Sequence, residues 1–479
     1  MEVDPDYIRE NLDEIGIKEA KAILREWINN SNDRHLRKRA LKVYGLIDKG
    51  ADFKFFEQLY LSDEDPTLRI LTGEILKDYY YSNKKLISLL DFTLTNEKSI
   101  NQKLQALEML SIINTKKTRK IINDYMKKII KLNFKRGIEL LPKEIIELED
   151  YKAIPESILE IYSEILLYDY FIKMCGYNVI LRKGLITLLN CEGSRLKSIS
   201  EIPAIDKLSN LEHLYLQRNE ISKIQNLQHL SYLKVLNLGN NNIKKIENLE
   251  SLRNLEELIL SNNKIKKIEN INLKKLKKLS LDGNQLTNIN YLDGFSNLES
   301  LNLSYNNISE ISELRTLRKL KNLTLSHNSI GEIAGLQNLD NLITLHLNNN
   351  LITKIDGLGE LINLKVLNLT NNRIEKIENL DSLENLKKLE LSNNRIQLIE
   401  GLDKLIKLQE LFLDKNQIKS LEGIKGLKSL IILFLENNEI SEFQLKQLET
   451  LKSLNFIFLN DNPLDVKSRE LYKRLSRLP

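Results

Sequence analysis

Histidine and cysteine are the residues of this sequence that metal-ion or nucleophilic chemistry would need first. The 479 residues include five histidines and two cysteines, Cys175 and Cys191. His327 and His346 are 19 positions apart, but a metal site needs three or four ligands and no third one is apparent. Cys191 stands where the surrounding pattern otherwise has leucine, which favours a buried thiol over a nucleophile. We therefore expect solvated histidines and an inert cysteine.

Motifs for catalysis and nucleotide binding are missing from the sequence. It contains no Gly-Lys-Ser/Thr phosphate loop, no Gly-x-Gly-x-x-Gly after a strand, no Gly-x-Ser-x-Gly elbow, no His-Glu-x-x-His and no Cys-x-x-Cys. The 71 basic and 66 acidic residues leave a net charge of +5, too dilute to indicate a nucleic-acid or membrane partner. We expect a folded protein that is not an enzyme, with no catalytic residue, metal or cofactor.

The expected compartment is the cytoplasm. Residues 1–11 are acidic and lack the apolar stretch of a secretory signal. No apolar run reaches the roughly 18 residues of a transmembrane helix. Two cysteines are too few for a disulfide framework, which favours a reducing environment.

One string of residues recurs through the C-terminal part of the chain. Leu211-Glu-His-Leu-Tyr-Leu-Gln-Arg-Asn-Glu-Ile221 is the first of twelve copies, which are 22 residues apart except for one spacing of 21 and a last one of 24. Positions 3 to 5 of each copy are predicted to form a strand whose even positions point inward. The asparagine that follows can bond backbone groups of its own and the adjacent coil. This predicts a ladder of Asn219, Asn241, Asn263, Asn284, Asn306, Asn328, Asn350, Asn372, Asn394, Asn416, Asn438 and Asn462.

A second apolar set closes each coil on its opposite side, as Ile246, Leu249 and Leu252 do. One coil cannot bury its own core, so the coils must stack. The convex segment, about residues 245–251, is short and carries Glu-Asn or Asp-Gly in different copies. These features favour a 3₁₀ turn over a full α-helix.

The repeat resembles the leucine-rich repeat family, in the 22-residue class shared by the protein phosphatase-1 regulatory subunit and the bacterial internalins. The resemblance covers residues 185–479 and implies a curved solenoid of 12 or 13 coils with a parallel concave β-sheet, over 185–462. Ile186, Leu189, Cys191 and Leu196 resemble an atypical first coil, with Ser194 in place of the ladder asparagine. Residues 463–479, which include Tyr472 and Leu475, resemble a shortened form of the helical cap of intracellular members.

Residues 1–180 have a different pattern, with apolar positions three and four apart, and are predicted to be all helical. Three stretches share a weak motif at offsets of 32 and 34. Asp33 and Asp65-Pro66 have the form of helix N-caps. The pattern resembles HEAT-type helical repeats, and a plain helical bundle is the alternative. The motif copies are Asp33, Arg37, Ala40, Tyr44; Asp65, Arg69, Thr72, Leu76; and Ser99, Lys103, Ala106, Leu110.

A basic segment, residues 116–136, lies within the helical part. It contains nine lysines and arginines and a single acidic residue, Asp124. Nucleic-acid binding through this segment is one alternative function. However, isoleucines interleave with the lysines at helical spacing, and we favour an ordinary solvated helix face.

Residues at positions 3 and 5 of each copy are expected to point outward from the concave sheet. The middle copies carry small polar residues there, whereas the last three carry an apolar patch that we expect to bind protein. The alternatives are that the coil edge or the helical half covers these side chains, or that they serve cross-strand packing alone. The predicted protein-binding residues are Phe412, Phe434, Phe456, Phe458, Ile432, Glu390, Glu410, Tyr215 and His346.

The resemblance also bears on the partner. The phosphatase regulator holds its partner with aromatic and acidic concave residues, which Phe412, Phe434 and Phe458 with Glu390, Glu410 and Glu436 resemble, but the polar middle coils do not. We therefore predict a non-catalytic scaffold or adaptor for a protein partner, with no small-molecule substrate. A regulatory subunit of an enzyme such as a phosphatase or small GTPase is the first alternative.

Overall fold

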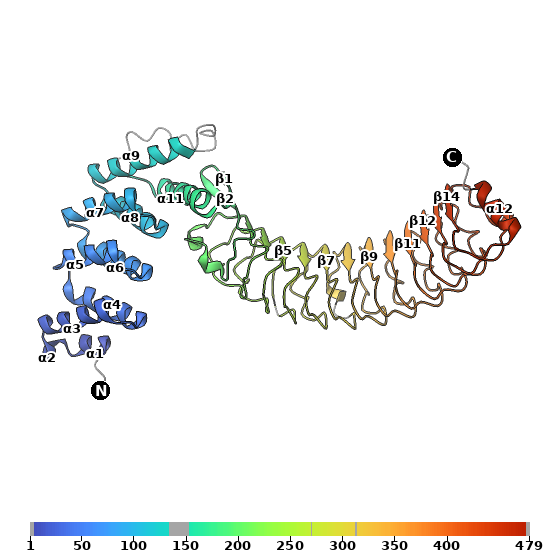
Figure 1. Ribbon diagram of the computed structural model, residues 1–479, viewed down its shortest axis with the longest axis horizontal. Coiled ribbons are helices and arrows are strands. Elements are labelled where there is room, and N and C mark those ends of the chain that lie inside the picture. Colours follow the sequence, from blue (N-terminus) through green and yellow to red (C-terminus); the bar gives the residue numbers. More distant parts are fainter. Residues whose placement is uncertain (1–3, 134–152, 270, 312–313, 476–479) are drawn as a thin grey trace. The chain divides into compact units, whose positions relative to one another are not determined.

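The computed structural model describes residues 4–133, 153–269, 271–311 and 314–475. The chain forms two compact units, Met1–Leu188 and Leu189–Pro479 (Figure 1). The first is mainly helical and the second is a solenoid of parallel strands, which is the predicted fold class.

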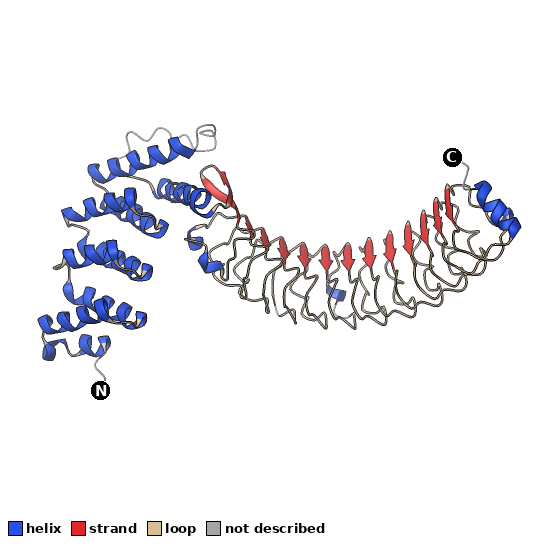
Figure 2. Cartoon of the chain, in the orientation of Figure 1, coloured by secondary structure: helices blue, strands red, loops and turns tan. Residues whose placement is uncertain are grey.

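Pairs of helices make up the first unit. Helix α3 packs on α4, α5 on α6 and α7 on α8, while α4, α6 and α8 also pack on one another in succession. After α11 come a single π-helical turn and two short strands (Figure 2). The elements are α1 (Pro5–Glu10), α2 (Leu12–Ile15), α3 (Ile17–Asn30), α4 (Arg34–Asp48), α5 (Phe53–Ser62), α6 (Pro66–Tyr80), α7 (Lys84–Asn96), α8 (Ile100–Ile113), α9 (Lys116–Asn133), α11 (Glu156–Tyr170), the π turn Phe171–Cys175, β1 (Asn178–Arg182) and β2 (Leu185–Asn190).

The N-caps predicted for two of these helices are confirmed. Asp33 accepts a hydrogen bond from the His35 N–H at 2.8 Å. Asp65 does the same for the Thr67 N–H at 2.9 Å, with Pro66 as the first residue of α6. The three copies of the weak motif lie at equivalent places on α4, α6 and α8. That the pairs are of the HEAT type stays a prediction.

One contact recurs between successive helix pairs. In α4, the Arg37 Nε donates to the Ile28 carbonyl at 2.6 Å, and its guanidinium pairs with Asp63. One pair later, Arg69 Nε donates to a carbonyl, that of Tyr60, at 3.1 Å. Its guanidinium then pairs with Glu97. Each arginine thus ties its own helix to the preceding one and to an acid further along the chain.

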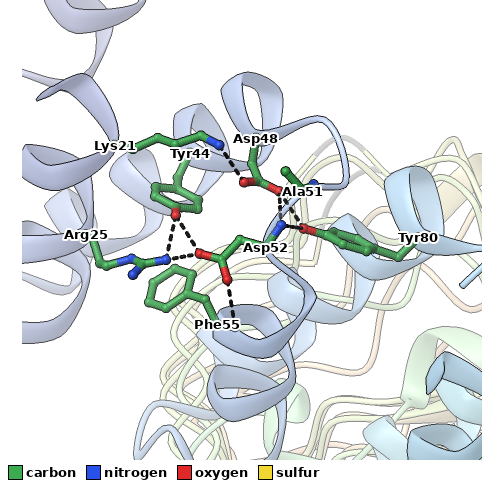
Figure 3. Close-up of polar contacts among 8 residues, drawn as sticks. All are labelled: Lys21, Arg25, Tyr44, Asp48, Ala51, Asp52, Phe55 and Tyr80. Atoms are coloured by element: carbon green, nitrogen blue, oxygen red, sulfur yellow. Dashed lines mark hydrogen bonds and ion pairs between the residues drawn. The ribbon is translucent and has the colours of Figure 1, made fainter. Parts of the chain in front are cut away.

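A buried carboxylate holds the first two helix pairs together (Figure 3). The Asp48 side chain has no exposed surface and accepts hydrogen bonds from Lys21 at 2.7 Å and from the Tyr80 hydroxyl. Two backbone N–H groups of the turn before α5 also donate to it, at 2.9 and 3.0 Å. Beside it, Arg25 pairs with Asp52. Helices α3, α4 and α6 therefore converge on one charged cluster.

Twelve parallel strands of three residues each, one per coil, form the sheet of the second unit among the described residues. They line the inner side of the curved solenoid (Figure 2). In each of β3 to β13 the central leucine is buried between two half-buried or exposed residues, as the alternation of a strand requires. The strands are β3 (His213–Tyr215), β4 (Val235–Asn237), β5 (Glu257–Ile259), β6 (Lys278–Ser280), β7 (Ser300–Asn302), β8 (Asn322–Thr324), β9 (Thr344–His346), β10 (Val366–Asn368), β11 (Lys388–Glu390), β12 (Glu410–Phe412), β13 (Ile432–Phe434) and β14 (Phe456–Phe458).

The predicted asparagine ladder is confirmed. Asn241 donates from its amide to the carbonyl of Leu238 in its own coil and to that of Leu216 in the preceding one, at 3.0 and 2.9 Å. Its Oδ1 accepts the Ile221 N–H of the preceding coil at 2.9 Å. Each ladder residue thus satisfies backbone groups of two coils that the interior would otherwise leave unpaired.

The predicted 3₁₀ turn is wrong for residues 245–251, which form neither a helix nor a strand and end in a turn. The described convex 3₁₀ turns are Ile199–Glu201, Ile205–Lys207, Leu314–Thr316 and Leu445–Gln447. Asn248 explains the difference, because its φ of 59° is left-handed and its amide donates to the Ile224 carbonyl one coil earlier. Gly357 takes the same left-handed conformation at its coil, with a φ of 68°. In these two coils the Glu-Asn and Asp-Gly pairs therefore mark a left-handed residue. In the coil of Asp293-Gly294 the left-handed residue is instead Tyr291, with a φ of 64°.

The two ends of the solenoid differ from its middle. In the first coil, the carbonyl of the buried Cys191 accepts from the amide of Asn219, while the Leu196 N–H donates to Asn219 Oδ1. The first coil therefore uses the asparagine of the second. At the other end, the predicted cap helix is confirmed as α12 (Val466–Leu475). Ser468 in this helix accepts the Phe443 N–H at 3.0 Å. Predicted cap residues Leu478 and Pro479 lie outside the described residues.

Candidate protein-binding surface

Three phenylalanines form a stack on the concave face of the last coils. Parallel pairing places Phe412 beside Phe434, and Phe434 beside Phe458. The first pair of ring centroids is 4.8 Å apart with planes at 11°, and the second pair 4.3 Å apart at 8°. In-register parallel strands about 4.8 Å apart put equivalent side chains face to face. We call these three residues the aromatic stack.

Apolar side chains continue the surface beside the aromatic stack. Ile432 and Phe456 are register partners at position 3 of the last two strands. Phe456 is 55% exposed, which is a large share for an aromatic ring, while the three stacked rings are half-buried. The five side chains predicted to form an apolar patch thus lie on adjacent strands. The stacking buries ring faces against one another, and the three rings remain partly exposed.

A charged cluster adjoins the aromatic stack. Lys388 Nζ lies 2.7 Å from Glu390 Oε1, 3.6 Å from Glu410 Oε2 and 4.9 Å from the centroid of the Phe412 ring. The hydrogen bond to Glu390 raises the pKa of Lys388, so the ammonium stays charged. Both glutamates were among the predicted binding residues, whereas Lys388 was not. Its place at position 3 of β11, diagonal to an aromatic residue of β12, was the available signal.

Two other predicted residues lie apart from the aromatic stack. Tyr215 is on β3, the first of the twelve three-residue strands, and His346 is on β9. Both point from the concave face and are half-buried. Burial lowers the pKa of His346, so the imidazole is neutral at pH 7. The structure therefore does not gather all nine predicted residues into one site.

The second histidine of the candidate metal pair has a different environment. His327 stacks on Tyr305, with centroids 4.1 Å apart, and its Nε2 contacts the Asn349 amide at 3.2 Å. Both histidines are half-buried rather than solvated as predicted. In the described part of the chain, no group of three or more His, Cys, Asp or Glu residues could hold a metal ion. Burial also raises the pKa of the Cys175 thiol, which disfavours the thiolate.

Family comparisons agree with this geometry. The family described as "Leucine Rich repeats (2 copies)" matches residues 209–251, 233–271, 253–294, 340–382 and 384–426, and a second, "Leucine rich repeat", matches 274–330. The chain belongs to the leucine-rich repeat family. Leucine-rich repeat proteins generally serve as scaffolds for protein interaction, and those of similar fold are typically non-catalytic.

Two solved structures are similar to this chain. A leucine-rich repeat protein from Leptospira interrogans is 29% identical and matches 60% of this chain and 81% of its own, with a TM-score of 0.51. An internalin, InlF, from Listeria monocytogenes is 31% identical over 61% of this chain and 92% of its own, with a TM-score of 0.49. No curated protein matches the sequence.

The middle of the leucine-rich repeat sheet is polar and internally paired. Residues just before strands β3 to β8 alternate in charge, so each lysine among them pairs with a glutamate of the neighbouring coil. The side chains at the concave centre, such as Asn302 and Thr324, are small. The pairs are Lys234 with Glu212 at 3.0 Å, Lys277 with Glu256 at 2.8 Å and Lys321 with Glu299 at 2.8 Å. This region offers no large anchor to a partner.

The basic segment of the helical unit has the form of an ordinary amphipathic helix. In α9, Ile122, Met126 and Ile129 are buried while most of the lysines are exposed. Lys135 and Arg136, part of the predicted segment, lie outside the described residues. The described helices include none long and apolar enough to cross a membrane.

Proposed function

We propose that this leucine-rich repeat protein is a non-catalytic adaptor that captures a protein partner on the concave face of its last coils. The observation that carries the proposal is the aromatic stack. Its three rings stand on adjacent strands of a sheet whose middle is polar. Contiguous exposed apolar surface of this kind marks interaction sites in soluble proteins.

The phenylalanines of the aromatic stack are preorganised for binding. Strand pairing and ring stacking already fix each phenylalanine, so a partner loses little side-chain entropy on ordering them. Interface energy concentrates in a few aromatic anchors surrounded by weaker contacts. Phe456 and Ile432 provide the surrounding apolar area. The adjacent charged residues, Lys388, Glu390 and Glu410, provide a polar rim.

The charges favour one chemistry for the partner. Lys388 is engaged with Glu390 and Glu410, and these three groups together carry a net negative charge. A partner segment with a large apolar side chain next to a lysine or arginine would complement both features. The helical unit would hold a second partner or orient the first. We propose the cytoplasm as the compartment of this protein, because two cysteines in 479 residues are too few for a disulfide framework.

The test compares two substitutions on the same face. Phe434→Asp removes the central ring of the aromatic stack, whereas Asn302→Asp adds the same charge at the polar centre on β7. Proteins captured from a cell lysate by the immobilised wild-type chain would be identified and their affinities measured. We expect Phe434→Asp to lower the affinity for the protein that binds this surface by about thirtyfold or more. Asn302→Asp should change the affinity little.

The folding of Phe434→Asp must be checked separately, because this ring stacks on both neighbours. Phe456→Asp serves as a second variant, since Phe456 is exposed and its ring is outside the stack. Circular dichroism would establish that both variants keep the fold. If both are folded and bind every captured protein normally, the recognition surface lies elsewhere and the proposal is wrong.

A further inference from the structure

Five lysines line one hollow on the turns that follow β4 and β5. The hollow has a volume of about 510 Å³. All five lysines are exposed. One acid, Glu269, and one amide, Gln285, complete the lining. The lysines are Lys244, Lys245, Lys264, Lys266 and Lys267.

Two consecutive coils create this concentration of charge. Each carries the string Ile-Lys-Lys-Ile, at 243–246 and at 265–268. The four isoleucines are buried and fix the turns, so the lysines between them must point outward. Because neighbouring coils are only about 4.8 Å apart at the sheet, two lysine doublets are placed side by side. Mutual repulsion makes this arrangement unfavourable without a counter-charge.

Some lysines on neighbouring coils elsewhere in the solenoid are matched with acids. Along the row before the strands, Lys234, Lys277 and Lys321 each pair with a glutamate of the adjacent coil. None of the five lysines of the hollow forms an ion pair with any residue that the structure describes. The fold therefore has the means to neutralise neighbouring lysines and does not use it here. An anionic ligand would provide the missing counter-charge.

The shape of the basic region indicates a compact ligand. The coil before it has Ser222-Lys223 at the doublet positions, and the coils after it have Thr287-Asn288 and Ser309-Glu310. The doublets thus end after two coils, and Glu310 would repel a phosphate chain that continued along the solenoid. No aromatic side chain lines the hollow on which a base could stack. A nucleic-acid strand is therefore disfavoured.

We propose that this hollow binds a small anion with several phosphate groups, of the inositol polyphosphate type, either free or as the headgroup of a lipid. Its volume lies in the range of pockets that hold small molecules, roughly 300–1,000 Å³. Lysine ammonium groups bind phosphate as point charges and can each donate to different oxygens. The Gln285 amide can donate to a phosphate or hydroxyl oxygen at the edge.

The test uses inositol hexakisphosphate and the full chain. Calorimetric titration at about 0.15 M salt should give one bound molecule per chain. Lys245→Gln with Lys267→Gln removes one lysine from each doublet and should weaken binding roughly tenfold or more. The matched control is Lys354→Gln with Lys376→Gln, which changes the same repeat position in two other adjacent coils, where no lysine doublet occurs. The control should change affinity less than about twofold.

Two further arms identify the source of the phosphate groups. Sedimentation with phosphatidylcholine vesicles, with and without phosphatidylinositol 4,5-bisphosphate, tests a lipid headgroup. Stronger binding to the phosphoinositide vesicles assigns the site to a lipid, and binding of the soluble probe alone assigns it to a free polyphosphate. The proposal fails if neither probe binds, if both double variants lose affinity equally, or if single-stranded RNA binds more tightly with increasing length.

Discussion

The two units of this chain connect their repeats with different chemistry. The solenoid joins coils through neutral amides, such as Asn241, whose four hydrogen bonds all go to backbone groups. The helical unit joins its pairs through charges, with Arg37 bound to Asp63 and Arg69 to Glu97. The asparagines and the arginines both donate hydrogen bonds to backbone carbonyls as well. They differ in what can replace each connecting residue.

This difference explains why one repeat is overt in the sequence and the other is faint. An asparagine that must both accept from an N–H and donate to carbonyls in the same small space has no substitute of equal geometry. An arginine at a partly exposed joint needs only some acid within reach, and the acid can shift in sequence. Asp63 follows Arg37 by 26 residues, whereas Glu97 follows Arg69 by 28. The helical period therefore drifts, while the solenoid keeps a spacing of 22 at all but two places.

The largest expected effect tests the charged connections. Asp48→Ala would leave Lys21, the Tyr80 hydroxyl and two backbone N–H groups without their common acceptor. Removing one partner of a buried ion pair costs about 3–5 kcal/mol. Trp27, the single tryptophan, lies on α3 and reports on the helical unit. We expect the free energy of unfolding of the helical unit, measured in urea by Trp27 fluorescence, to fall by about 3–5 kcal/mol.

The matched control for that experiment is Asp6→Ala, which removes a carboxylate from an exposed ion pair with Arg39 in the same unit. Exposed pairs contribute about 0–1 kcal/mol. Hydrogen exchange in the solenoid should be unchanged by either variant. If Asp48→Ala and Asp6→Ala destabilise the helical unit equally, the buried cluster does not connect its helices as described.

The sequence predicts most of the solenoid and part of the candidate surface. Each strand, the ladder asparagines and the register of Phe412, Phe434 and Phe458 follow from a period of about 22, because stacked coils repeat the same environment. The left-handed Asn248 was missed, although Glu-Asn and Asp-Gly are signals for it. The contact of Lys388 with Phe412 was also missed, because it depends on side-chain geometry across strands.

Other contacts depend on conformations that a repeat pattern does not specify. His327 reaches Tyr305 because both residues precede a ladder asparagine and have left-handed backbones, with φ of 55° at each. A periodic sequence places them in one column but does not show that they stack. In the helical unit, Asp48 meets Lys21 and Tyr80 only after three helices pack. No local pattern links residues so far apart in sequence.

A smaller effect tests the amide ladder. Asn328 donates to the carbonyls of Leu303 and Leu325 and accepts the Ile308 N–H, each at 3.0 Å. Asn328→Ala leaves these groups unpaired, and we expect a loss of about 1–3 kcal/mol. Thr324→Ala, at an outward position of the same coil, should be nearly neutral. Equilibrium unfolding monitored by hydrogen exchange of coils β7–β9 measures both. A larger loss for Thr324→Ala would contradict the assignment of inward and outward positions.

The smallest expected effect is a difference in acid sensitivity between the charged contacts of the helical unit and the amide ladder of the solenoid. Burial pulls the pKa of Glu97 upward, but hydrogen bonds from the Ser99 and Lys98 N–H groups and the charge of Arg69 outweigh it, so the pKa lies below its ordinary value of 4.5. A group with a lowered folded pKa stabilises the protein above its unfolded pKa. This contribution is lost as the pH falls below about 4.5 through the folded value. The ladder amides do not titrate in this range.

Surface pairs of the solenoid could obscure this difference, because hydrogen bonds from Lys277 and Lys321 also lower the pKa values of Glu256 and Glu299. Those glutamate side chains are 42% and 41% exposed, against 16% for Glu97. Salt at about 1 M screens exposed pairs strongly and buried ones much less. In such salt, hydrogen exchange should show α6–α8 losing protection at a higher pH than strands β7–β10. Glu97→Gln should remove much of the acid sensitivity of α6–α8, because its side chain no longer titrates. If the solenoid loses protection first, charged connections are not what makes the helical unit sensitive to acid.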